Sequence, residues 1–288
     1  MARTLAGLCC YVAGHSARAI GVYALCKVAT GDIATPKERM STLSKEDVKI
    51  HLPNVGAFAL EQDEEFFEIE EDGTRRRIRC HDYGEIYSVP GLYEQLFAEA
   101  LSCDSPRVVV GLLYETLKEH DQDPGELRAV DLGAGNGMVA EELDRIGADS
   151  IVGVDILEQA KEAAERDRPG LYDAYHAVDV TELDPLLQED LEQRELNCVT
   201  CVAALGFGDM PPDAFRAAYD LVEPDGWVAF NIRDRFINGE DSSGFSDLLE
   251  RMFDEGELIE HTRHRYQHRL SVQGEPLHYV AMVAQKAG

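Results

Sequence analysis

A glycine-rich stretch in the middle of the chain constrains the fold more than any other feature. It reads Val130-Asp131-Leu132-Gly133-Ala134-Gly135-Asn136-Gly137, with three alternate glycines directly after an apolar run. Glycine adopts backbone angles that other residues avoid, and it lets a ligand approach where a Cβ would collide. Val139, Leu143 and Ile146 then follow at helical spacing on one face. The stretch therefore predicts a strand, a tight ligand-binding turn and a helix.

An acid follows the next predicted strand, about 20 residues beyond the glycines. Residues 150–154 are short, apolar and β-branched, and Asp155 ends the run. An acid in this position can accept hydrogen bonds from the two hydroxyls of a ribose. Enzymes that bind nicotinamide dinucleotides share this device, but their fingerprint has a glycine where this chain has Met138. Asp155 therefore indicates a nucleoside ligand, and Met138 disfavours a nicotinamide oxidoreductase.

Strand-like and helix-like segments alternate through the second half of the chain. Further strands are expected at 176–180, 198–205 and 227–232, and Gln273-Gly274-Glu275-Pro276 predicts a hairpin turn near the end. Such alternation predicts an α/β fold with a doubly wound, mostly parallel sheet. Ligands of such sheets bind beyond the carboxyl ends of the strands.

The order of these features resembles the class I S-adenosylmethionine-dependent methyltransferases. The shared features are the D-x-G-x-G-x-G motif from Asp131 to Gly137, Asp155 after the second strand and Asp179 after the third. The resemblance covers about residues 126–288. It implies a Rossmann-like, mostly parallel seven-stranded sheet with an antiparallel last strand. It also implies S-adenosylmethionine as the cofactor, with its carboxylate at the helix N-terminus after the glycines.

The resemblance also assigns residues to the cofactor. Asp155 would hold the ribose, and Asp179 would receive the adenine amino group beside the backbone N–H of Val180. The expected cofactor-binding residues are Asp131, Gly133, Gly135, Asn136, Gly137, Asp155, Ile156, Asp179, Val180, Ala203 and Leu205.

The methyl acceptor is less constrained, because displacement at a sulfonium needs alignment more than a strong base. The loop after the fourth strand lacks the Asn/Asp-Pro-Pro-Tyr/Phe signature of enzymes that methylate amino groups of nucleic acids and glutamine, which favours a small-molecule acceptor. Methylation of a protein side chain and a non-catalytic cofactor-binding module remain alternatives. Arg233 would hold an anion, His268 would act as a base, and neighbouring carboxylates are the alternative partners of Arg233. Candidates for the acceptor pocket are Tyr83, Tyr87, Tyr93, Phe207, Arg233 and His268.

Composition limits the class of partner. The chain has 55 acidic and 27 basic residues and a formal charge of −28, which disfavours nucleic acid. Its seven cysteines form no regular framework, which favours a reducing, cytoplasmic location. Cys198 and Cys201 share a predicted strand, where positions three apart face opposite sides, so buried thiols are expected rather than a metal site. His261, His264 and His268 likewise fail to converge on a strand, and no metal is expected.

Three regions are expected along the chain. Residues 1–39 are an atypical, apolar extension interrupted by Arg18 and Lys27, too short of apolar residues to span a membrane. We expect the native chain to begin at Met40. Residues 40–125 would form a lid lobe whose three tyrosines fold over the ligand, or alternatively a packing joint between lobes. Residues 126–288 would be the methyltransferase domain.

Overall fold

The computed structural model describes residues 48–53, 60–71, 73–205, 210–236 and 244–288. Residues 45–288 form one compact unit. The predicted extension 1–39 and Phe207 lie outside the described residues.

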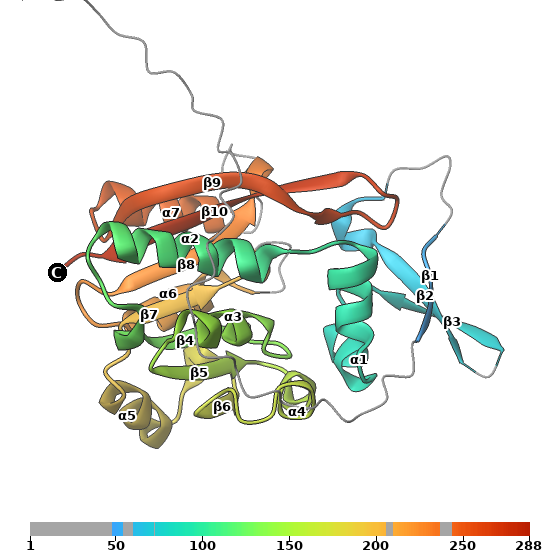
Figure 1. Ribbon diagram of the computed structural model, residues 1–288, viewed down its shortest axis with the longest axis horizontal. Helices are drawn as coiled ribbons and strands as arrows, with labels where there is room; N and C mark the ends of the chain where they lie inside the picture. The colour runs from blue at the N-terminus through green and yellow to red at the C-terminus, as the bar shows by residue number, and fades with distance from the viewer. Residues whose placement is uncertain (1–47, 54–59, 72, 206–209, 237–243) are drawn as a thin grey trace, which may run out of the picture. The chain divides into compact units, whose positions relative to one another are not determined.

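A seven-stranded sheet forms the centre of this unit (Figure 1). Its strand order is β6-β5-β4-β7-β8-β10-β9. The first five strands in this order are parallel, and β10 runs antiparallel to both β8 and β9. The predicted sheet with an antiparallel last strand is therefore confirmed. The strands are β4 (Arg128–Leu132), β5 (Ser150–Asp155), β6 (Ala174–Ala177), β7 (Cys198–Cys201), β8 (Trp227–Arg233), β9 (Leu258–Leu270) and β10 (Pro276–Lys286).

Helices connect these strands and cover both faces of the sheet. Side chains of α2 and α3 share one apolar core with the sheet, and those of α5, α6 and α7 share the other. The helices are α2 (Ser105–Glu119), α3 (Met138–Ile146), α4 (Glu158–Asp167), α5 (Pro185–Gln193), α6 (Pro212–Asp220) and α7 (Phe245–Asp254), and the short turns are η3 (Pro124–Glu126) and η4 (Val180–Glu182).

Alternation along the strands divides the apolar residues between the two cores. Ala129 packs with one core and Val130 with the other. Cys198 and Cys201 divide in the same way, because residues three apart on a strand face opposite sides. Burial raises the pKa of the Cys198 thiol to about 12, so it is inert.

A second, three-stranded antiparallel sheet precedes the large one. Its order is β1-β2-β3, and an apolar cluster that includes Phe67, Ile69 and Ile78 covers one face. The helix α1 that follows packs against α4 of the large domain. The elements are β1 (Lys49–His51), η1 (Gln62–Glu64), β2 (Phe66–Glu71), β3 (Thr74–Arg79), α1 (Tyr83–Ser88) and a π-helical segment η2 (Glu94–Ala100).

The long hairpin of β9 and β10 contains two irregularities. Leu277 pairs with Arg269 and His278 with Gln267, so His268 is an extra residue in β9. A β-bulge of this kind bends the strand and redirects a side chain. At this bulge two neighbouring residues, His268 and Arg269, are both buried, with exposed fractions of 4% and 3%.

Candidate active site

A cavity of about 430 Å³ opens at the carboxyl ends of the parallel strands. Its walls come from the turns after β4, β5, β6 and β7, as expected for a doubly wound sheet. Helix α1 with the two residues before it, Tyr93, and Met210, Pro211 and Ala214 at the start of α6 contribute the remaining wall. The predicted site residues in these walls are Tyr83, Tyr87, Tyr93, Gly133, Asp155, Ile156, Asp179, Val180 and Ala203.

The glycine turn adopts conformations that only glycine tolerates well. Gly133, Gly135 and Gly137 have φ angles of 69°, 53° and 88°. A Cβ added to Gly135 would collide with the hydroxyl of Tyr87. Gly135 and Asn136 line a smaller adjoining cavity of about 40 Å³. The turn thus brings its backbone against both a cavity and the tyrosine of α1.

Asp155 connects the glycine turn with the end of β5. Its carboxylate accepts hydrogen bonds from the backbone N–H of Gly135 at 2.9 Å and of Leu157 at 3.0 Å. Burial raises its pKa, although these N–H donors oppose the shift. The carboxylate therefore holds the turn in place while it lines the cavity.

Asp179 and Val180 lie together at the far end of the same cavity. The exposed Asp179 carboxylate accepts from the hydroxyl of Thr181 at 2.7 Å and from its backbone N–H at 2.9 Å, and these bonds lower its pKa. Asp155 and Asp179 thus line one cavity, as the order of motifs suggests.

Asp131 lies beneath the glycine turn, outside the walls of the described cavities. It is fully buried and accepts hydrogen bonds from Thr200 at 2.8 Å and Tyr172 at 3.0 Å. Burial raises its pKa to about 7. Its position fits support of the turn from below more directly than contact with a ligand.

The three predicted tyrosines form a continuous aromatic stack over the cavity. The ring centroids of Tyr83 and Tyr87 are 6.3 Å apart, and those of Tyr87 and Tyr93 are 4.9 Å apart. Burial raises the pKa of Tyr93 above that of a free phenol, so its hydroxyl stays protonated. We call residues 83–97 the tyrosine segment.

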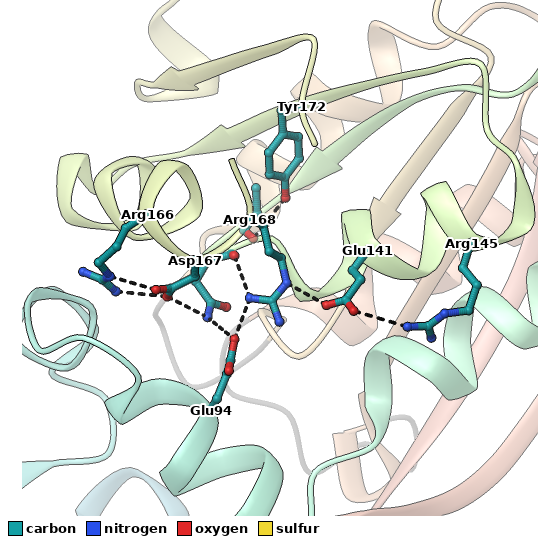
Figure 2. Close-up of polar contacts among 9 residues, drawn as sticks. Glu94, Glu141, Arg145, Arg166, Asp167, Arg168 and Tyr172 are labelled. Carbon is teal, nitrogen blue, oxygen red and sulfur yellow. Dashed lines mark hydrogen bonds and ion pairs between the residues drawn. The ribbon is translucent and has the colours of Figure 1, made fainter. Parts of the chain in front are cut away.

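An ionic network joins the tyrosine segment to the glycine turn (Figure 2). Arg168 lies 2.7 Å from Glu94 and 2.8 Å from Glu141, and it donates to the carbonyl oxygen of Asn136 at 3.1 Å. Both Glu94 and Arg168 are largely buried, with side-chain exposed fractions of 16% and 13%. No motif marks either residue in the sequence, because the pair forms only when two distant segments meet.

A third cavity, of about 30 Å³, also adjoins the first. We call it the small cavity. The two share Tyr83, Tyr93 and Ala203 in their walls, and Leu205 and His268 line the smaller one. Arg233 is not part of the wall of either described cavity. Strand β7 ends at Cys201, before the predicted residue 205, and Ala203 has a φ of 59°.

His268 is held by polar groups that sequence patterns did not identify. Its Nδ1 lies 2.6 Å from the Ser105 hydroxyl and 3.7 Å from the Cys103 thiol. Burial, with nearby Arg269 and Arg233, lowers its pKa well below 6.5, so the ring is neutral. The bulge in β9 is the feature that turns it into the cavity.

The described residues hold neither a cluster of metal ligands nor a helix suited to span a bilayer. No set of three His, Cys, Asp or Glu side chains gathers there in a metal-binding arrangement. None of the helices in the same residues combines the length and apolar character needed to cross a bilayer.

Comparisons with known proteins give a matching family and several relatives. A family described as "Methyltransferase domain" matches residues 98–278, more than half of the chain. A ubiquinone biosynthesis O-methyltransferase of Neisseria meningitidis serogroup C is 35% identical over 107 residues, covering 36% of this chain and 43% of that protein. The Bordetella avium protein of the same name is 34% identical over 110 residues, covering 38% and 43%. The chain thus spans less than half the length of these relatives.

An S-adenosylmethionine-dependent methyltransferase from Clostridium acetobutylicum superposes with a TM-score of 0.48 at 13% identity, covering 68% of this chain and 97% of that one. The matched family region includes the glycine turn, Asp155 and Asp179, which line adjoining cavities. The chain therefore belongs to the methyltransferase-domain family, and its cofactor is S-adenosylmethionine.

Proposed function

We propose that this protein transfers a methyl group from S-adenosylmethionine to a small-molecule acceptor. The observation that carries the proposal is the cavity of about 430 Å³ between the strand ends and the tyrosine segment. This volume lies within the roughly 300–1,000 Å³ of small-molecule sites. Its walls combine the carboxylates Asp155 and Asp179 with the stacked tyrosines.

Within this proposal the cofactor lies along the strand ends. Asp155 accepts from the ribose hydroxyls, Ile156 covers the adenine, and Asp179 and Val180 meet its polar edge. Gly133, Gly135, Asn136 and Gly137 face the amino-acid end, and Asp131 supports them from beneath. Ala203 and Leu205 lie where the two cavities join, beside the methyl group.

The proposed acceptor enters from the tyrosine side. Tyr83, Tyr87 and Tyr93 would enclose it, and His268 would contact it from β9. The formal charge of −28 argues against a nucleic acid, and the curated relatives are named as O-methyltransferases, which favours oxygen as the acceptor atom. Among the alternatives, no described contact favours a protein side chain.

Methyl transfer requires the protein mainly to align the two reactants and to exclude water from the reacting atoms. When bound, S-adenosylmethionine supplies a methyl group on a cationic sulfur. A lone pair of the acceptor, in line with the S–C bond, attacks the methyl carbon and displaces the sulfur. The tyrosine stack excludes water from the reacting atoms, and the turn residues hold the nucleoside in register. The acceptor oxygen gains the methyl carbon, the sulfur leaves as neutral S-adenosylhomocysteine, and the proton of the acceptor hydroxyl is released to bulk solvent.

Calorimetric titration tests the proposal. We expect S-adenosylmethionine and S-adenosylhomocysteine to bind and NAD to leave no signal. Asp155→Ala should weaken binding of both sulfur nucleosides at least about tenfold, since it removes charge-assisted hydrogen bonds. Asp190→Ala, on exposed α5, is the matched control and should bind as the wild type does. Absence of binding of both sulfur nucleosides to the wild type would refute the proposal.

A further inference from the structure

A chain of hydrogen bonds runs from Ala203 to His268. The backbone N–H of Ala203 donates to Asn231 Oδ1, and Asn231 Nδ2 donates to the Tyr266 hydroxyl, both at 2.6 Å. The Tyr266 hydroxyl lies 2.6 Å from the Ser105 hydroxyl, which lies 2.6 Å from His268 Nδ1. All four side chains are buried. The chain thus links the junction of the two cavities with the imidazole.

The direction of this chain follows from its first member. A backbone N–H can only donate, so the Asn231 atom that faces Ala203 is its oxygen and the atom that faces Tyr266 is its nitrogen. Tyr266 therefore accepts from Asn231. Its own hydrogen points to Ser105, the other side-chain partner that Tyr266 has among the described residues.

The same logic then determines the histidine tautomer. Ser105 accepts from Tyr266, and its own hydrogen goes to His268 Nδ1 at 2.6 Å rather than to the Cys103 sulfur, which is a weak acceptor. A neutral imidazole that accepts at Nδ1 carries its proton on Nε2. His268 is therefore a hydrogen-bond donor at Nε2. This differs from the expectation that it acts as a base.

A hydrogen-bond acceptor, the side-chain oxygen of Gln62, also belongs to the lining of the small cavity. Gln62 is only 6% exposed and lines the cavity with His268. Its Nε2 donates to the Tyr279 hydroxyl at 2.9 Å, and the Tyr279 ring lies 4.0 Å from that of His268. Its Oε1 has no hydrogen-bond partner among the described residues. A buried acceptor in this state is costly unless a ligand or water donates to it.

Charge and size limit what fits between these groups. The guanidinium of Arg269 is 2.5 Å from Glu65, and both side chains are almost fully buried, so this pair adds no net charge. The volume of about 30 Å³ exceeds the roughly 10–15 Å³ that one water requires and admits no ring. A hydroxyl group fits in size, because its oxygen accepts one bond and its hydrogen makes another.

We infer that the small cavity is a hydroxyl subsite, in which His268 Nε2–H donates to a hydroxyl oxygen of the acceptor and Gln62 Oε1 accepts the hydrogen of that hydroxyl. The rest of the acceptor extends into the larger cavity through the wall shared by Tyr83, Tyr93 and Ala203. His268 thus selects and anchors the acceptor and removes no proton from it. This inference rests on the proposed function for the identity of the larger cavity.

The tautomer is measured directly by long-range ¹H–¹⁵N NMR of the histidine side chains. We expect His268 to be neutral and protonated at Nε2 near neutral pH. Ser105→Ala and Tyr266→Phe should each release this tautomer and give a mixture, because the first removes the donor to Nδ1 and the second frees the serine oxygen to accept from an Nδ1–H. A ring protonated at Nδ1, or a cationic ring, in the wild type would overturn the inference.

Ligand chemistry is tested with phenol and toluene on protein saturated with S-adenosylhomocysteine. Phenol should shift the His268 Nε2 signal and toluene should not. Gln62→Met should weaken phenol binding about five- to tenfold, the effect of one lost hydrogen bond. The same variant should bind S-adenosylhomocysteine normally. Equal shifts with both probes would refute the subsite. Failure of the wild-type protein to bind S-adenosylhomocysteine would instead refute the proposed function.

Discussion

The carboxylate of Glu94 lies 2.7 Å from the guanidinium of Arg168 and joins the tyrosine segment to the core domain. Arg168 also donates to the carbonyl oxygen of Asn136, so the pair is bonded to the glycine turn itself. Figure 2 shows Arg168 between Glu94 and Glu141. The position of the tyrosine segment and the conformation of the turn are therefore physically coupled.

Breaking this pair should loosen the tyrosine segment. Glu94→Gln removes the charge that faces Arg168, at a cost of about 1 kcal/mol for a partly buried pair. We expect amide hydrogen exchange in residues 83–97 to accelerate about fivefold. Glu141→Gln, which removes the partner of Arg168 on the core side, is the matched control and should leave exchange in that segment unchanged. Equal acceleration in both variants would contradict the coupling.

Gly135 should tolerate no side chain. Its φ of 53° is unfavourable for alanine, and a Cβ would meet the Tyr87 hydroxyl. Gly135→Ala should lower the free energy of unfolding by about 1–3 kcal/mol in urea titrations. Gly111→Ala, in α2 with nothing within 4 Å of the added Cβ, should be neutral or stabilising.

The collision can be separated from the backbone strain. In a Tyr87→Phe background the hydroxyl is absent, so Gly135→Ala should cost less than in the wild type. The residual cost would report the positive φ together with the remaining contact of the Cβ with the ring, whose Cζ lies 3.2 Å away. A cost that is identical in both backgrounds would show that Tyr87 does not contact the turn.

Asp131 should make stability depend on pH with an unusual sign. Its pKa is about 7 in the folded protein against 3.8 for the ordinary group, because the carboxyl is buried. The folded state therefore keeps a proton that the unfolded state releases. As pH rises between these two values, the contribution of Asp131 to the free energy of unfolding falls. Asp131→Asn cannot ionise, and its stability relative to the wild type should rise by at least about 1 kcal/mol from about pH 5 to about pH 8.

Urea titrations at both pH values measure this difference. Asp179→Asn is the control, because the pKa of this exposed carboxyl is lowered and its small contribution has the opposite sign. A stability difference between Asp131→Asn and wild type that does not change with pH would contradict the raised pKa.

The buried pair of Arg269 and Glu65 should be intolerant of single substitutions. Their exposed fractions are 4% and 1%, and Glu65 also accepts from the Val272 backbone N–H at 2.8 Å. Arg269→Met leaves a buried carboxylate uncompensated and should cost about 3–5 kcal/mol. Arg194→Met, at a more exposed pair with Asp190, should cost less than about 1 kcal/mol. Urea titration of both variants makes the comparison, and equal costs would show that burial does not govern the pair.

The cavity wall at the strand ends was largely predictable because its residues follow strands in order. A strand, a glycine turn and a helix leave a local pattern, and the acids at 155 and 179 come directly after apolar runs. Parallel strands bring their carboxyl ends to one edge, so order along the chain predicts proximity. Asp131 is different, since a strand pattern does not say which acid points beneath the turn.

The walls formed by the tyrosine segment and by His268 were only partly predictable. His268 and the three tyrosines were candidates by residue type, but Gln62, Ser105 and Glu94 leave no pattern. Their partners lie between 74 and 217 positions away along the chain, as with Gln62 and Tyr279 and with Glu94 and Arg168. The bulge at His268 is equally invisible, because it depends on how β10 pairs with β9.

The sequence by itself determined the sheet, the glycine turn and the acids after its strands, because these depend on local periodicity and on the freedom of glycine. Only the tertiary structure decided that Arg168 meets Glu94 and that the imidazole of His268 meets the buried hydroxyl of Ser105. Both are consequences of burial and hydrogen-bond direction, which exist only once distant segments are packed together.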